Sequence, residues 1–200
     1  MDKKAPGKLT NACYELAEVM VSAIFVIALM FLFFFRFAGV VGESMVPTLN
    51  DKDWLAVSAT PGNPARGDVV IISQPNAHNE PLVKRVIALE GETIALRDGF
   101  VYIDGQLLNE SAYLAEDVRT YPAPEGMSIA DVVDGEMVLR IPKGYVFVMG
   151  DNRMNSSDSR FTDVQLINEN YILGKVMLRL RPFGQFFIAK RAALSVYPYG

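Results

Sequence analysis

The chain is poor in the side chains that most often build disulfides, metal sites and serine-protease triads. Its 200 residues include one cysteine, Cys13, and one histidine, His78. A single cysteine excludes an intramolecular disulfide, and the lack of a cysteine–histidine cluster excludes a zinc site made of these ligands. His78 lies in the polar segment PNAHNE, where a solvated surface imidazole is the simplest interpretation. We therefore expect any hydrolase chemistry to use a lysine or a carboxylate as its base.

The sequence also lacks the signatures of nucleotide and nucleic-acid binding. No Gly-x-x-x-x-Gly-Lys segment is present to cradle phosphates, and the net charge of −4 gives no reason to expect nucleic acid as a partner. We predict no cofactor and no metal. Two hundred residues are enough for one membrane segment and one compact domain, but not for two large domains.

The charge is distributed unevenly along the chain. After Glu169 the sequence contains basic residues and no acidic residue. The basic residues are Lys175, Arg179, Arg181, Lys190 and Arg191, and apolar residues among them include Leu180, Phe183, Phe186, Phe187 and Ile188. This segment fits either a basic tail that rests on anionic lipid or a last strand with one solvated face. The sequence leaves both interpretations open.

Residues 19–35 form a long apolar run in which Ser22 is the only polar side chain. As a helix this run measures about 25 Å, and continuing it through Val41 with Arg36 snorkelling completes the roughly 30 Å of a bilayer core. The run is longer than the core of a signal peptide, and no small-x-small cleavage site follows it. We therefore predict an uncleaved transmembrane anchor over residues 19–41.

Basic residues set the expected orientation of this anchor. Lys3, Lys4 and Lys8 precede the apolar run, whereas the basic residues just after it are mixed with acidic ones. The positive-inside rule then places residues 1–18 in the cytoplasm and the domain after the anchor on the extracytoplasmic side of the cell membrane. The lipid bilayer is thus an expected partner.

Beyond the anchor, short apolar segments alternate with turn residues. The dipeptides Asp98-Gly99 and Asp104-Gly105 are typical two-residue hairpin turns on either side of the segment FVYI. The segments that read as strands are 54–57, 69–72, 82–87, 100–103, 137–141, 145–149 and 174–180.

The pattern as a whole predicts a mainly β fold preceded by one transmembrane helix. We expect an antiparallel-sheet domain over residues 42–189. Within it, the more polar and irregular residues from about 106 to 136 read as a small inserted subdomain, and residues 190–200 read as a C-terminal tail.

Three segments contain candidate chemistry. Ser44 lies in GESMVPTL, where a proline-fixed turn can present its hydroxyl outward, although such a segment is usually an ordinary loop. Lys84 lies in the apolar segment LVKRVIAL. If Lys84 is buried there, burial lowers its pKa and makes the amine a usable base. If the segment is an edge strand, Lys84 and Arg85 both point to water. The segment GDNRMNSSDSR at 150–160 is dense in groups that can brace a site or form a surface loop.

These segments, in this order behind an apolar anchor, resemble the type I signal peptidases, which are serine-lysine proteases that remove signal peptides from exported proteins. The matching segments are ESMVPTL, GDVV at 67–70, LVKRVIALEGE, and GDNRMNSSDSR followed by GKVMLRLRPF. Each segment alone is a weak signal, whereas all of them in order are specific. The short chain with one span is most similar to the Gram-positive-type enzymes.

The resemblance implies a role for each matched residue. Ser44 is expected to be the nucleophile and Lys84 the general base, with their Oγ and Nζ atoms within roughly 3–3.5 Å of each other. Ser156 is expected to hold the lysine amine in place. The other supporting residues form two expected ion pairs, Asp151 with Arg85 and Asp158 with Arg160.

The resemblance also implies how the substrate is recognised. Signal peptides end in a small-x-small pattern, which the family reads with two shallow apolar pockets beside an extended substrate strand. The residues expected to line these pockets are Met45, Leu82 and Val83. The Ser44 backbone N–H is the expected oxyanion donor, and Gly42 stands where some relatives supply a second donor from a serine. Met154 replaces a residue that is polar in many relatives.

Two other functions fit parts of the sequence. Self-cleaving repressors share a serine-lysine core but carry a DNA-binding domain, which the 18 residues before the apolar run cannot form. A membrane-tethered β-domain that binds exported proteins without catalysis is the other alternative. The presence of Ser44, Lys84 and Ser156 together argues against it.

Overall fold

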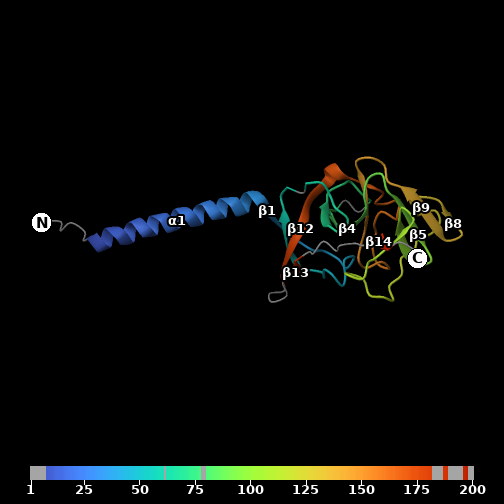
Figure 1. Ribbon diagram of the computed structural model, residues 1–200, viewed down its shortest axis with the longest axis horizontal. Helices are drawn as coiled ribbons and strands as arrows, with labels where there is room; N and C mark the ends of the chain where they lie inside the picture. The colour runs from blue at the N-terminus through green and yellow to red at the C-terminus, as the bar shows by residue number, and fades with distance from the viewer. Residues whose placement is uncertain (1–7, 61, 78–79, 182–186, 189–195, 198–200) are drawn as a thin grey trace.

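The computed structural model describes residues 8–60, 62–77, 80–181, 187–188 and 196–197. His78 and the predicted tail residues Lys190 and Arg191 lie outside these ranges. Helix α1, Lys8–Phe34, extends away from the β-rich part of the molecule (Figure 1). Its apolar stretch Ala12–Phe34 is not buried by the rest of the protein. At 1.5 Å per residue this stretch measures about 35 Å, which is long enough to cross a bilayer.

The helix does not continue to Val41, where the apolar run predicted the end of the anchor. The chain leaves the helix at Phe34, and Phe35–Gly39 forms strand β1. This strand pairs with β2, Trp54–Ser58, in antiparallel register from Phe35 opposite Ser58 to Gly39 opposite Trp54. Pairing with β2 satisfies the backbone groups that a longer helix would have satisfied internally. The anchor therefore connects directly to the edge of a sheet.

The first sheet lies next to the helix (Figure 1). It contains Lys84, whereas the segment of Ser44 and residues 150–160 are loops that each follow one of its strands. Its strand order is β1-β2-β12-β3-β4-β10-β11, with β13 also paired to β12, and every pairing is antiparallel. The remaining strands are β3 Val69–Ile72, β4 Leu82–Ala88, β10 Tyr145–Met149, β11 Ile167–Asn168, β12 Ile172–Arg181 and β13 Phe187–Ile188, with the 3₁₀ turn η1 Glu169–Tyr171 before β12. The predicted strands in this region are all present.

The second sheet lies at the end of the molecule away from the helix (Figure 1). Its order is β14-β7-β6-β5-β9-β8. The strands are β5 Thr93–Arg97, β6 Phe100–Ile103, β7 Gln106–Leu108, β8 Val132–Val133, β9 Glu136–Arg140 and β14 Val196–Tyr197. Both predicted hairpin turns form, with positive φ at Asp98 and Gly99 (53° and 80°) and at Asp104 and Gly105 (48° and 80°), as two-residue hairpin turns with Asp-Gly require.

Residues 106–136, which we predicted as an inserted subdomain, contain only part of the second sheet. Strands β7 and β8, which lie inside those boundaries, pair with β6 and β9, which lie largely outside them. The sheet thus begins at β5, whose sequence TIALR mixes polar and apolar residues and gave no strand signal. The loop from 109 to 131 is the irregular part of this region.

Three clusters of buried apolar side chains form the core around the two sheets. One of them joins the sheets, because it packs Ile87 and Phe147 of the first against Ile94 and Leu96 of the second. The other two lie on opposite sides of β3: Val69 and Ile71 belong to one, and Val70 and Ile72 to the other. A strand buried on both faces reads as a continuous apolar run, which explains why VVII was recognisable in the sequence.

Two of the basic residues that strand β12 contributes to the C-terminal segment form ion pairs within the domain. Lys175 forms an ion pair with Asp68 at 2.8 Å, and Arg179 pairs with Asp53 at 3.4 Å. These two basic side chains are therefore held inside the domain, as part of a strand that pairs with both β2 and β3.

Candidate active site

Ser44 lies on a turn that the chain makes directly after β1. The two ends of this turn are closed by a hydrogen bond from the Val40 N–H to the Asp53 carbonyl oxygen at 2.8 Å. Met45 and Leu49 are each 1% exposed and anchor the turn in the apolar cluster below it. Ser44 itself is half-buried, so the turn holds its hydroxyl at the surface of the first sheet.

Lys84 reaches this hydroxyl from the middle of the sheet. Lys84 is 3% exposed and lies in strand β4, between β3 and β10. The Nζ atom donates a hydrogen bond to Ser44 Oγ at 2.6 Å. Burial lowers the pKa of Lys84 from 10.5 to about 8; Asp158 and Asp151 oppose this shift, and Arg160 adds to it. Near pH 8 a large fraction of the amines is therefore neutral and able to accept a proton.

The segment 150–160 packs against the Ser44 turn. The Asn152 N–H donates to the Ser44 carbonyl oxygen at 3.0 Å, and the Asn152 side chain donates to the Glu43 carbonyl oxygen at 3.1 Å. Gly150 is required here, because an added Cβ would lie 2.3 Å from both the Ser44 carbonyl oxygen and Ser156 Oγ. The close approach of these two segments thus depends on a residue without a side chain.

Two buried ion pairs hold the same segment in shape. Arg85 Nε and Nη2 donate to Asp151 at 2.8 and 2.6 Å. Arg160 donates from Nε and Nη2 to Asp158 at 2.8 and 2.9 Å, and Asp158 also accepts the Gly150 N–H at 3.1 Å. The structure therefore brings together both pairs that the resemblance implies.

A groove of about 480 Å³ leads to the Ser44–Lys84 pair. Residues 36–41 and residues 80–84 are among those that line it. Met45, Leu82 and Val83, the expected pocket residues, all line this groove. Among the described residues, no group of three or more histidine, cysteine, aspartate or glutamate side chains is placed to hold a metal ion.

Residues 13–181 match the family model described as signal peptidase, peptidase S26. The chain belongs to this family. It is 35% identical over 187 residues to signal peptidase I T of Bacillus subtilis (strain 168), covering 92% of this chain and 93% of the relative. It is 37% identical over 170 residues to signal peptidase I of Bacillus caldolyticus, covering 82% of this chain and 89% of the relative. The resemblance inferred from the ordered segments is confirmed.

A solved structure is also similar to this chain. It is a crystal structure of a signal peptidase I from Enterococcus faecalis V583, with 28% sequence identity and a TM-score of 0.42. The match covers 57% of this chain and 97% of that chain.

One contact expected in this member of the signal peptidase family is not formed. Ser156 is 9% exposed, and its Oγ atom is buried without a hydrogen-bond partner among the described residues. The lysine amine is hydrogen-bonded to Ser44 instead. Ser156 lies close to Gly150, so it packs beside the site without contacting the amine in this arrangement.

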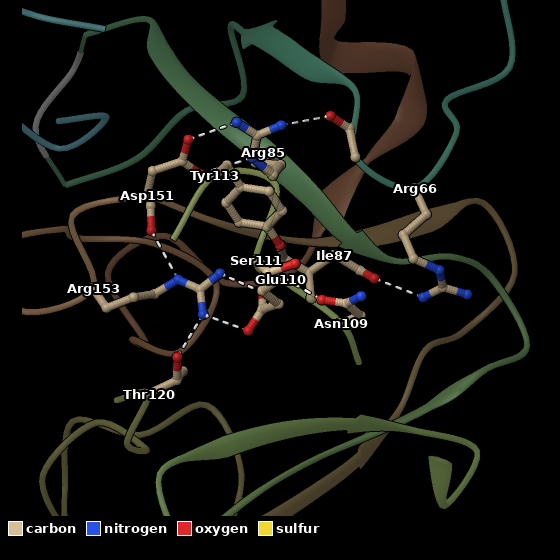
Figure 2. A network of polar contacts seen from close by, with 12 residues as sticks. Arg66, Arg85, Ile87, Asn109, Glu110, Ser111, Tyr113, Thr120, Asp151 and Arg153 are labelled. Carbon is tan, nitrogen blue, oxygen red and sulfur yellow. Dashed lines mark hydrogen bonds and ion pairs between the residues drawn. The ribbon is translucent and has the colours of Figure 1, made fainter. Parts of the chain in front are cut away.

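The sequence did not reveal two parts of this signal peptidase site. Residues 37–41 line the groove, but they were assigned to the anchor helix because their apolar composition fits either structure. The second part is a polar network from Glu110 and Tyr113 to Arg153 (Figure 2). No local pattern marks this network, because its two segments lie about 40 residues apart in sequence.

Proposed function

We propose that this chain is a membrane-anchored serine endopeptidase that removes N-terminal signal peptides from exported preproteins. Ser44 is the nucleophile and Lys84 the general base. The observation that carries the proposal is the 2.6 Å hydrogen bond between a buried lysine amine and a half-buried serine hydroxyl. Family membership supports the same reaction class.

The reaction follows from this pair. The neutral Lys84 amine accepts the Ser44 proton as Oγ attacks the scissile carbonyl, and the ammonium then gives that proton to the departing amine. An ester between Ser44 and the signal peptide remains. Lys84 next takes a proton from water, hydroxide attacks the ester carbonyl, and the proton returns to Ser44 Oγ as the peptide leaves with a free carboxylate.

We assign the first oxyanion donor to the Ser44 backbone N–H. The Gly42 N–H donates to Asp51 Oδ1 at 3.0 Å, so in this arrangement it is occupied and is not the second donor. Gly42 has φ +88°, a conformation that favours glycine.

The groove supports recognition of an extended peptide. Two of the chain segments that line it, 36–41 and 80–84, can pair through their backbone with the substrate as an added strand. Met45, Leu82 and Val83 are apolar and suit the small side chains that precede the cleaved bond.

The anchor supports access to membrane-inserted substrates. Ser44 follows the end of α1 at Phe34 by ten residues, several of which form β1, so the nucleophile is held close to the helix end. We place the N-terminus in the cytoplasm and the catalytic domain on the extracytoplasmic side, where an exported chain emerges.

The test is cleavage of a preprotein by the full chain in liposomes. Lys84→Ala is expected to lower cleavage by roughly 1,000-fold or more, because Ser44 loses its base. Lys143→Ala is the matched control, since Lys143 is exposed in the turn before β10 and its loss leaves cleavage unchanged. Folding of both variants is checked by thermal unfolding. Full cleavage by a folded Lys84→Ala variant would rule out the dyad.

A further inference from the structure

A buried network of opposite charges links the second sheet's loop to the segment 150–160. Figure 2 shows the Tyr113 ring between the guanidinium groups of Arg85 and Arg153. The Arg85 group lies 4.0 Å from the ring centroid and the Arg153 group 5.9 Å from it. The Tyr113 hydroxyl donates to Glu110, which in turn accepts hydrogen bonds from Arg153.

The charges in this network balance. Arg85 is paired with Asp151 and Arg153 with Glu110, so two guanidinium groups meet two carboxylates. The Arg153 side chain is fully buried and the Glu110 side chain is 11% exposed. A buried guanidinium group without a carboxylate partner is strongly disfavoured. Arg153 therefore depends on Glu110 to remain buried here.

Arg153 joins the loop 109–120 to the segment beside the dyad. Its Nε atom donates to the Gly150 carbonyl oxygen at 3.1 Å, and Nη1 donates to Thr120. Its own carbonyl oxygen accepts from Arg160 at 2.9 Å. Gly150 is the residue that packs against Ser44, so a shift of Arg153 moves the backbone on which the Ser44 turn rests.

Tyr113 also contacts the residue that follows Lys84. It covers Arg85, which directly follows Lys84 in β4 and holds Asp151. The ring restricts the guanidinium group to one plane, and this keeps both hydrogen bonds to Asp151 aligned. The loop 109–120 therefore contacts Arg85, the residue next to Lys84, and Arg153, which binds Gly150 beside the Ser44 turn.

We propose that Tyr113 and Glu110 are positioning residues for the dyad, acting through Arg85 and Arg153. The inference rests on the proposed function, because it concerns the geometry of the same two reacting groups. Neither residue touches the groove. Each sets the position of the backbone or charged group that borders Ser44 and Lys84.

The experiment compares three variants of the full chain in liposomes with a cleavable preprotein. Tyr113→Leu removes the ring, Tyr113→Phe keeps the ring and removes the hydroxyl, and Glu110→Gln keeps the shape and removes the charge. Tyr102→Leu is the matched control, because Tyr102 is buried in the second sheet and stacks with Arg97 at 4.2 Å. It lines no part of the groove.

The proposal predicts a change in kcat rather than in KM. Tyr113→Leu and Glu110→Gln are expected to lower kcat by roughly tenfold while KM stays within about twofold, because misplaced reacting groups slow chemistry more than binding. Tyr113→Phe is expected to recover most of the rate. Tyr102→Leu is expected to lower thermal stability and leave kcat near that of the unmodified chain.

Unchanged kcat in a folded Tyr113→Leu variant would overturn the proposal, as would an equal loss in Tyr102→Leu. If Tyr113→Leu does not fold, Glu110→Gln decides, and unchanged kcat there overturns the proposal. Lys84→Ala is measured in parallel. Cleavage that does not depend on Lys84 contradicts the proposed function, whereas cleavage that depends on Lys84 but not on Tyr113 or Glu110 contradicts only the positioning role.

Discussion

The two sheets share an apolar core but differ in the polar groups that they bury. Strands β5 to β9, all of whose residues the structure describes, bury no charged side chain. The end of the first sheet near Ser44 buries Lys84, Arg85, Asp151, Arg153, Asp158 and Arg160. Burying a charge carries a desolvation cost of several kcal/mol, which only well-aligned partners offset. The difference shows where the fold gives up stability to hold a defined arrangement of charges.

The largest expected effect comes from breaking a buried ion pair at the end of the first sheet near Ser44. Asp151→Asn leaves Arg85 without its carboxylate partner, and we expect a loss of about 3–5 kcal/mol in the free energy of unfolding. Glu136→Gln is the matched change in the second sheet, where Glu136 and Arg97 lie 4.0 Å apart and are about 40% exposed. Its expected cost is below about 1 kcal/mol. Chemical denaturation measures both, and equal costs would contradict the contrast between the sheets.

A smaller effect is expected from replacing Gly150, where the segment 150–160 packs against the Ser44 turn. Gly150→Ala places a methyl group 2.3 Å from the Ser44 carbonyl oxygen, so the turn must move. We expect a loss of roughly 100-fold in kcat, since a displacement of about 1 Å at reacting groups has that effect.

Gly174→Ala provides the comparison for this prediction. Its methyl group would lie 2.3 Å from the Ser58 carbonyl oxygen and 2.5 Å from Val57 Cγ1, so it presses on strand β2 rather than on the Ser44 turn. It is expected to lower the thermal midpoint while changing kcat much less than Gly150→Ala. A similar fall in kcat for both variants would show that the Gly150 effect is a general loss of packing.

The sequence predicted the strands inside the domain better than the segment that joins the helix to the first sheet. Strands such as VVII and YVFVM are continuous apolar runs, and Asp98-Gly99 and Asp104-Gly105 mark the turns on either side of FVYI. Strand β1 was missed because FRFAG, apart from Arg36, continues the apolar composition of the run before it. Only its pairing with β2 distinguishes it from a further helical turn.

The site was predicted in the same uneven way. Ser44 and Lys84 were found through the order of the segments that contain them, and the structure brings their side chains together. Glu110 and Tyr113 could not be found, because their contacts with Arg153 and Arg85 depend on how the loop 109–120 folds back. The expected hydrogen bond between Ser156 and the lysine amine is not formed among the described residues.

The most direct test of the dyad is the pH dependence of Ser44 acylation by a serine-reactive lactam, followed from about pH 6 to about pH 10. Because the neutral amine is the active form, the rate is expected to rise with pH and to reach half its maximum at the pKa of Lys84, which is about 8. Acylation is read by intact-protein mass, with Ser44→Ala as the blank. A rate that does not change with pH, or one that rises only near the 10.5 of an ordinary lysine, would contradict the account.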